Sequence, residues 1–206
     1  MSLLAPLLEP VATIMGMPLS VGDLAGFATG LVCVWLTTRS HIGNFPVGIV
    51  NCVILGLVFV ELRLFSDAGL QVIFIIMSLI GWRAWLRHDG NAASLPVFRS
   101  NGREWLLLAL AASLVTLLLR QLMLWAKGSA PLLDALITAM SLCAQWLLNQ
   151  RRRDSWLWWI AVDVVSIPLY LSRGLPLIAV LYTVFLLLCI RGWFAWRAPQ
   201  AVGATA

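Results

Sequence analysis

The polar side chains that could bind a solute lie inside long apolar runs of this 206-residue chain. The most informative is Asp163, which has apolar neighbours on both sides in the segment WLWWIAVDVVSIPLY. A carboxylate in an apolar environment is costly unless it meets a cation, a proton or hydrogen-bond donors. Asp163 therefore has three interpretations, which are contact with a ligand, a polar tie to a neighbouring helix, and coupling to protons.

Two further side chains precede Asp163 at helical spacing, Trp159 four residues earlier and Ser155 eight residues earlier. Residues with this spacing share one face of a helix. The face would present a hydroxyl, an indole and a carboxylate. Such a set suits a flat, cationic, hydroxylated ligand, through stacking and cation–π attraction. For Trp159 alone, packing among the neighbouring tryptophans is the alternative.

Four more polar residues within apolar runs complete the predicted substrate-binding set: Asn51, Gln71, Ser78 and Tyr182. Gln71 and Ser78 are two helical turns apart and share a face. Tyr182 corresponds to Gln71 at a shift of 111 in residue number, so that two related units would offer an amide and a phenol. Asn51 and Asp163 take similar places at a shift of 112, which assumes a one-residue change in a loop. An asymmetric solute would need such differences.

The elements that must position these residues are membrane-spanning helices. Only 11% of the residues are charged and 61% are hydrophobic, whereas a soluble domain has about 25% charged residues. A span needs about 20 apolar residues. Seven spans are predicted: 21–38, 45–62, 69–85, 104–125, 132–148, 156–171 and 175–196.

The segment 1–20 contains one charge, Glu9, and lacks the basic start of a signal peptide. We expect a short interfacial or peripheral helix there. With the N-terminus outside, ten Arg residues fall at the inner ends of the spans and four Lys or Arg residues at the outer ends. This bias predicts a cytoplasmic C-terminus.

An internal repeat organises the spans. GWRAWLR at Gly81 returns as GWFAWR at Gly192, and the same shift of 111 relates Trp35 to Trp146. Helices one to three therefore repeat as helices five to seven. A fourth helix restores the starting side of the membrane, so that the two units are parallel. Parallel repeats of this kind occur in SWEET-like transporters, with the substrate between the halves.

The predicted fold class is thus an all-α integral membrane protein of seven transmembrane helices in a 3+1+3 parallel repeat. Its five parts are an N-terminal peripheral segment, a first repeat, a linker with the fourth helix, a second repeat and a tail, at residues 1–20, 21–87, 88–131, 132–197 and 198–206. The two Gly-Trp pairs, Gly81-Trp82 and Gly192-Trp193, are expected to have a packing or gating role, or to belong to the site.

The chain lacks the sequence motifs of several functional classes. The chain has no GxxxxGK[ST] motif and no soluble-enzyme motif, so we expect no enzyme, no ATP-driven engine and no cofactor. Its four cysteines are in apolar runs and are interpreted as core residues, not metal ligands. The positive charge follows the loops, so no nucleic-acid partner is expected. A facilitator for a small polar solute is the simplest interpretation; a proton-coupled carrier and a non-transporting partner or receptor remain alternatives.

The chain resembles the PnuC family of vitamin transporters over roughly residues 24–197. The resemblance rests on NFPVGIVNCVILGLVFVELRLFSDAGLQVIFIIMSLIGWRAW and WLWWIAVDVVSIPLYLSRGLPLIAVLYTVFLLLCIRGWFAW. It implies a facilitator of the inner membrane, uptake driven by a cytoplasmic kinase that traps the solute, and assembly as a homotrimer. Nicotinamide riboside is the implied substrate.

Members that carry nicotinamide riboside resemble one another in an Asn-x-x-x-Trp-x-x-x-Asn ladder on the sixth helix. The matching positions here are Ser155, Trp159 and Asp163, so that the Trp is retained and both Asn are replaced. Ser78 also stands where Asn is frequent, whereas Gln71 is retained. These departures leave thiamine as an alternative substrate, and riboflavin as a weaker one because it is neutral.

Overall fold

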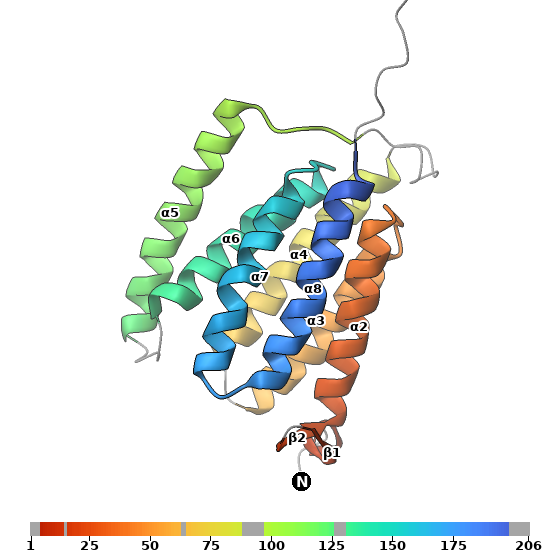
Figure 1. Cartoon of the computed structure of the whole chain (residues 1–206), viewed down its shortest axis with the longest axis vertical. Helices are drawn as coiled ribbons and strands as arrows, with labels where there is room; N and C mark the ends of the chain where they lie inside the picture. The colour runs from red at the N-terminus through yellow and green to blue at the C-terminus, as the bar shows by residue number, and fades with distance from the viewer. Residues whose placement is uncertain (1–4, 15, 63–64, 88–96, 126–130, 198–206) are drawn as a thin grey trace, which may run out of the picture.

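Seven long helices dominate the computed structural model, which describes residues 5–14, 16–62, 65–87, 97–125 and 131–197 (Figure 1). Each is long and apolar enough to cross a membrane. They are α2 (Val21–Thr38), α3 (Asn44–Glu61), α4 (Phe65–Leu86), α5 (Gly102–Trp125), α6 (Pro131–Asn149), α7 (Ser155–Ser172) and α8 (Pro176–Ala195). The predicted all-helical class with seven spans is confirmed.

Most predicted bounds agree with the observed helices to within two residues, because the spans end where the apolar runs end. The largest difference is at α4, which begins at Phe65 instead of Gly69. Its first turn contains Asp67, and a carboxylate near a helix N-terminus is stabilised by the helix dipole. A charged residue that looks like the end of a span therefore belongs to the helix.

The segment before α2 differs from the expected peripheral helix. Only α1 (Ala5–Leu8) is helical, and an antiparallel hairpin of β1 (Pro10–Ile14) and β2 (Met17–Ser20) follows it. Gly16, at φ 78°, provides the left-handed turn that the hairpin requires. The expectation of a helix is wrong beyond residue 8.

A capping box joins the hairpin to α2. The hydroxyl oxygen of Ser20 accepts a hydrogen bond from the backbone N–H of Asp23 at 3.1 Å. The carboxylate of Asp23 accepts one from the backbone N–H of Ser20 at 3.0 Å. This reciprocal arrangement satisfies backbone donors at the start of the helix. Asp23 is thus a capping residue at the end of a span.

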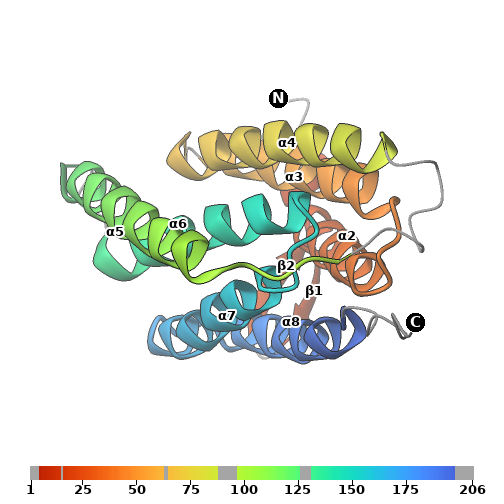
Figure 2. The ribbon, with the colours of Figure 1, turned by 90° about the horizontal axis from the view of Figure 1, so that it is seen from above.

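Two groups of three helices face each other. In Figures 1 and 2, α2, α3 and α4 pack together, and so do α6, α7 and α8. Between the groups, α2 packs against α8 and α4 against α6. The shift of 111 relates α2 to α6 and α4 to α8, so these two contacts are equivalent under the repeat. α5 lies at the side and packs mainly on α6.

The turns after α2 and α6 repeat in detail. Ser40 (φ 53°) and Arg151 (φ 56°) are the non-glycine residues of the described chain with positive φ. The backbone N–H of Ser40 donates to the carbonyl of Thr37 at 2.9 Å, and that of Arg151 donates to Leu148 at 2.9 Å. Both pairs of positions differ by 111, so the register passes through the turns without insertion.

A short extended segment leads into α5 and attaches to the α6–α7 turn. Phe98 forms a parallel bridge with Arg152, and the backbone N–H of Ser100 donates to the carboxylate of Asp154 at 2.5 Å. An ion pair of 2.6 Å joins Arg152 to Glu104 in the first turn of α5. One end of α5 is therefore fastened to the second group of helices.

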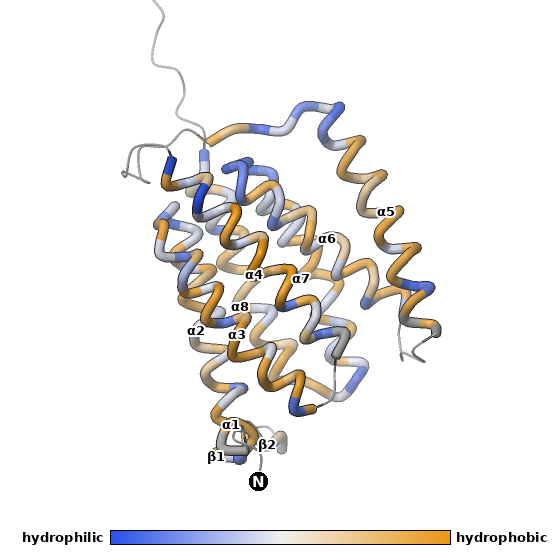
Figure 3. Tube along the Cα trace, turned by 180° about the vertical axis from the view of Figure 1, so that it is seen from behind, coloured by the Kyte–Doolittle hydropathy of each residue, from blue (hydrophilic) through white to orange (hydrophobic). Residues whose placement is uncertain are grey.

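The helices are hydrophobic over most of their length, and hydrophilic residues gather toward the two ends of the bundle (Figure 3). α5 is the clearest example, with seven leucines that are 53% to 62% exposed: Leu106, Leu107, Leu110, Leu114, Leu117, Leu118 and Leu122. Exposure of such an apolar surface to water is unfavourable, so lipid or another membrane-embedded chain is expected to cover it.

Candidate solute-binding site

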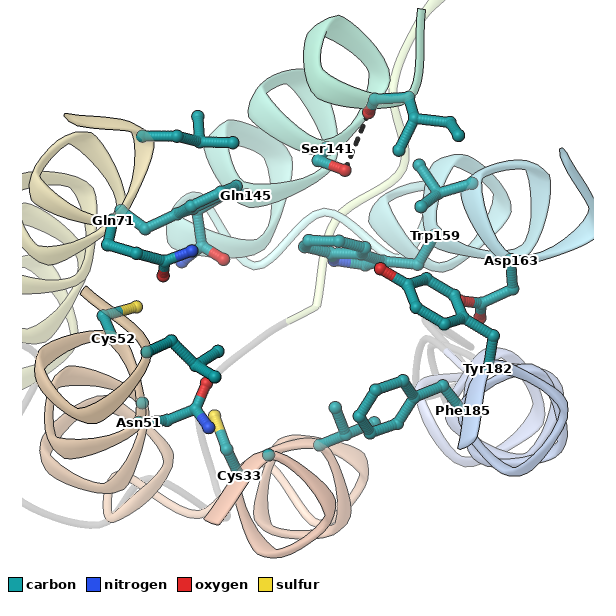
Figure 4. A pocket seen from close by; sticks show the side chains of 18 of the residues that line it. Cys33, Asn51, Cys52, Gln71, Ser141, Gln145, Trp159, Asp163, Tyr182 and Phe185 are labelled. Carbon is teal, nitrogen blue, oxygen red and sulfur yellow. Dashed lines mark hydrogen bonds between the residues drawn. The ribbon is translucent and has the colours of Figure 1, made fainter. Parts of the chain in front are cut away.

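A cavity of about 760 Å³ lies between the two groups of helices (Figure 4). Pockets for small molecules usually measure about 300–1,000 Å³. All six helices of the two groups contribute lining residues, and no described residue of α5 does. The fourth helix thus links the groups without forming the site.

Six of the seven predicted site residues line this cavity: Asn51, Gln71, Ser78, Trp159, Asp163 and Tyr182. They come from α3, α4, α7 and α8, two helices of each group. In Figure 4, Asn51 and Gln71 lie on one wall, whereas Trp159, Asp163 and Tyr182 lie on the opposite wall. The structure therefore brings both halves of the predicted set to one space.

Ser155 is the predicted residue that the structure does not bring to the cavity. It is fully buried, and its hydroxyl has no hydrogen-bond partner among the described residues. A ladder of every fourth residue turns by about 40° per step in a helix of 3.6 residues per turn. Two steps separate Ser155 from Asp163, and Trp156 reaches the cavity at that level instead.

Asp163 is 3% exposed, and its Oδ2 has no hydrogen-bond partner in the described part of the chain. The thiol of Cys189 on α8 is in hydrogen-bonding contact with the same carboxylate. A residue that served as a helix tie alone would satisfy both oxygens with neighbouring helices. Because Asp163 also lines a solute-sized cavity, its carboxylate is a candidate for contact with a ligand group.

Trp159 and Tyr182 provide the aromatic part of the same wall. Figure 4 shows the indole of Trp159 and the phenol ring of Tyr182 at the cavity, near Asp163. The ring of Tyr182 also packs against Tyr170 and Phe185, with centroids 5.1 Å and 5.9 Å away. An aromatic wall with a carboxylate can hold a flat cation by stacking and charge.

Asn51 has a structural role as well as a place at the cavity. Its Nδ2 donates to the carbonyl of Gly26 at 2.7 Å and to the hydroxyl of Thr29 at 2.9 Å. Both bonds tie α3 to α2 and use the amide N–H groups. The amide carbonyl is then the part of Asn51 that can accept a hydrogen bond from a solute.

The proposed pairing of Asn51 with Asp163 at a shift of 112 is wrong. Because the turns keep the shift of 111, the counterpart of Asp163 is Cys52 and the counterpart of Asn51 is Val162. All four side chains line the cavity. One wall therefore has the carboxylate of Asp163 where the other wall has the thiol of Cys52. The shift of 111, kept unchanged along the whole sequence, predicts this pair.

The sequence analysis missed several lining residues. Asp134, on α6, forms an ion pair of 2.7 Å with Arg173, which follows α7. The hydrogen bond that the Arg173 guanidinium donates to the Asp134 carboxylate raises the pKa of Arg173, so this group stays charged. Arg173 was one of the four basic residues at the outer ends of the predicted spans, and Asp134 was not selected for the site. Tyr170, Phe185 and Gln145 were not selected, although Gln145 is a polar residue inside an apolar run.

A family model described as nicotinamide mononucleotide transporter matches residues 20–198. The match includes all seven long helices. The chain belongs to this transporter family. The predicted resemblance is confirmed, and so is the expectation that the chain is not an enzyme. With its seven apolar helices, the chain is a multi-pass membrane protein.

Individual relatives support the same assignment. The chain is 22% identical over 207 residues to the nicotinamide riboside transporter PnuC of Escherichia coli K12, covering 88% of this chain and 87% of that protein. It is 26% identical over 180 residues to the riboflavin/roseoflavin transporter RibM of Streptomyces davaonensis, with coverages of 84% and 83%. The crystal structure of the vitamin B3 transporter PnuC matches with a TM-score of 0.67 and 25% identity, over 85% of this chain and 80% of that one.

Proposed function

We propose that this chain is a facilitator for a B-vitamin-type solute, with nicotinamide riboside as the first choice. The observation that carries the proposal is the buried carboxylate of Asp163, which lines the cavity on the same wall as Trp159 and has one oxygen without a partner among the described residues. Nicotinamide riboside has a flat cationic ring and a hydroxylated sugar. The ring suits the indole and the carboxylate, and the hydroxyls suit amides such as Gln71 on the other wall.

The charge of the cavity favours the riboside over a mononucleotide. Three carboxylates line the described cavity, those of Asp67, Asp134 and Asp163, against the one guanidinium of Arg173. Arg173 is already paired with Asp134. A phosphate group binds where cations or backbone N–H groups converge, and these carboxylates would repel it. We therefore expect the solute to enter without a phosphate.

Thiamine and riboflavin are the alternative solutes. Thiamine is flat and cationic and would use Asp163 in the same way. Riboflavin is neutral, so its binding would be stabilised less by the carboxylate. The similarity to RibM supports riboflavin as an alternative solute. Calorimetric titration of the purified protein with all three vitamins distinguishes them. The proposal expects saturable binding of nicotinamide riboside with the highest affinity; stronger binding of another vitamin would change the substrate.

The site assignment is tested by truncation. Trp159→Ala removes the stacking surface and Asp163→Ala removes the charge, so each should abolish measurable binding of nicotinamide riboside. Val164→Ala is a suitable control, because Val164 is on α7 but is exposed on the surface of the bundle. All three variants should elute as the wild type does in size-exclusion chromatography. Unchanged affinity in both cavity variants would overturn the assignment.

The energy source is tested in liposomes. A facilitator equilibrates its solute and leaves net uptake to a reaction that consumes it inside, such as phosphorylation by a cytoplasmic kinase. We expect uptake to stop at equal concentrations and to be unaffected by an imposed pH gradient. Adding a matching kinase and ATP inside should then increase accumulation. Uphill uptake driven by the pH gradient would instead support the proton-coupled alternative, and no uptake would support a non-transporting partner.

We also propose a location and an assembly. The ten-to-four distribution of basic residues supports an inner-membrane protein with the N-terminus outside and the C-terminus in the cytoplasm. The exposed leucine face of α5 is suited to contact other copies, in line with a homotrimer. Mass measurement of the detergent-solubilised protein tests this state, since a monomer would leave that face to lipid alone.

A further inference from the structure

The two Gly-Trp motifs meet at the arginine-rich end of the bundle, where four aromatic rings form a continuous chain. Phe45 contacts Trp85 with ring centroids at 5.0 Å, Trp85 contacts Trp196 at 6.1 Å, and Trp196 contacts Trp156 at 5.4 Å. All four are 1% to 2% exposed. The repeat shift of 111 relates Phe45 to Trp156 and Trp85 to Trp196. The chain of rings therefore maps onto itself under the repeat.

Two indole hydrogen bonds cross between the groups of helices at the same level. Nε1 of Trp85, on α4, donates to the carbonyl of Asn149 at the end of α6 at 3.2 Å. Nε1 of Trp196, just after α8, donates to the carbonyl of Thr37 at the end of α2 at 3.0 Å. Each bond is buried and links the third helix of one group to the first helix of the other.

The glycine of each motif makes room for a ring of this chain. A Cβ atom on Gly81 would first meet the side-chain amide of Asn149 and would also lie 2.6 Å from a ring carbon of Phe45. A Cβ atom on Gly192 would lie 2.5 Å from ring carbons of Trp156. Four residues later, Trp85 and Trp196 contact the same rings edge to face. The motif therefore builds an aromatic contact that a larger residue would prevent.

Among these four rings, that of Trp156 lines the cavity at this end. The lining residues of the cavity at this level, Thr37, Leu148 and Trp156, are at most 5% exposed. At the opposite end, the side chains of Asp134 and Arg173 are 30% and 27% exposed. A solute could thus pass Asp134 and Arg173 with small side-chain movements. It cannot pass the other end unless the rings separate.

We infer that Phe45, Trp85, Trp156 and Trp196 are the gate at the arginine-rich end, and that the two indole hydrogen bonds hold it closed. This inference rests on the proposed transport function. Because both bonds join the two groups, opening requires the groups to move apart at this end and breaks both bonds together. The structure is then a state that is closed at the arginine-rich end.

Native cysteines provide a test that needs no solute. Cys33, Cys52 and Cys189 line the cavity. A membrane-impermeant maleimide is applied to each side of oriented vesicles, and the labelled cysteines are identified by mass spectrometry. Trp85→Phe and Trp196→Phe each keep an aromatic ring and remove one of the two indole hydrogen bonds. Each loss should shift the equilibrium between the closed and open gate about fivefold toward the open state. Labelling from the arginine-rich side should increase by about that factor.

Trp158→Phe is the matched control, because Trp158 is buried and its Nε1 has no partner among the described residues. Its labelling should equal that of the wild type. If a gate variant does not remain monodisperse, Gly192→Ala replaces it, since the added Cβ displaces Trp156 and should also increase labelling from this side. Unchanged labelling in the folded gate variants would overturn the inference. If labelling increases as expected but the wild type takes up no solute in liposomes, the transport proposal fails and the gate remains supported.

Discussion

Asp163 is the residue on which the choice of solute depends. Its carboxylate is buried, shares contact with the thiol of Cys189 and keeps one oxygen without a partner among the described residues. The corresponding position of the other repeat is Cys52. The two walls of the cavity therefore differ in charge at equivalent places, and a solute with one cationic end would bind in one orientation.

An isosteric substitution separates charge from shape at this position. Asp163→Asn retains the size of the side chain and one acceptor oxygen, but it removes the charge and replaces the other oxygen with an NH₂ donor. If the carboxylate pairs with a cationic ring, affinity for nicotinamide riboside should fall about tenfold or more, because hydrogen bonds to charged groups contribute about 1.5–3 kcal/mol. Titration calorimetry measures the change. Weak binding of neutral riboflavin should stay the same, and an equal loss for both vitamins would show that charge is not what Asp163 contributes.

Among the elements, α2 packs closely against α3 through a row of glycines on α2. A Cβ on Gly22 would lie 2.6 Å from Val58, and a Cβ on Gly26 would lie 2.7 Å from Leu55. These glycines are four residues apart, a spacing that lets membrane helices approach. Gly30, one turn further along, lies beside Asn51 at the cavity.

This packing predicts a loss of stability on substitution. Gly26→Val should lower the unfolding temperature by several degrees, because overpacking costs about 1–3 kcal/mol. Gly69→Ala is a control within another span, since an added Cβ there meets nothing within 4 Å. Thermal unfolding in detergent measures both variants. Equal melting temperatures for Gly26→Val and the wild type would mean that α2 and α3 can separate at no cost.

The elements were largely predictable from the sequence because the apolar runs are long and end at charged residues. The start of α4 was missed because Asp67 looks like a boundary, although a helix N-terminus stabilises it. The hairpin before α2 was missed because its short, mildly apolar strands have no helical or strand period long enough to identify. In the site, the spacing that grouped Ser155 with Asp163 ignores the rotation of a helix over two such steps.

The site could be predicted only in part for a further reason. Polar residues within spans were selected because burial in lipid is costly, and six of them do line the cavity. Arg173 and Asp134 lie at the ends of spans, where charges are ordinary. Only the fold shows that these two side chains meet at 2.7 Å beside the cavity.

At the scale of the whole molecule, the repeat makes both the cavity and the proposed gate. The cavity lies between two groups of helices that exchange under the single repeat shift, and the aromatic chain lies at one end of it. Side chains within the cavity break this symmetry, whereas those in the gate largely keep it. A gate that serves both halves can be symmetric, but a site for an asymmetric solute cannot.

The extended segment that leads into α5 affects how the helices can move relative to one another. The bridge between Phe98 and Arg152 and the ion pair between Arg152 and Glu104 couple α5 to α6 and α7. If the two groups move apart at the proposed gate, α5 should therefore move with α6, α7 and α8, and α2 to α4 should form the smaller moving part. The β1–β2 hairpin is carried on α2, so a fluorophore on it would report the movement of that smaller part at the surface.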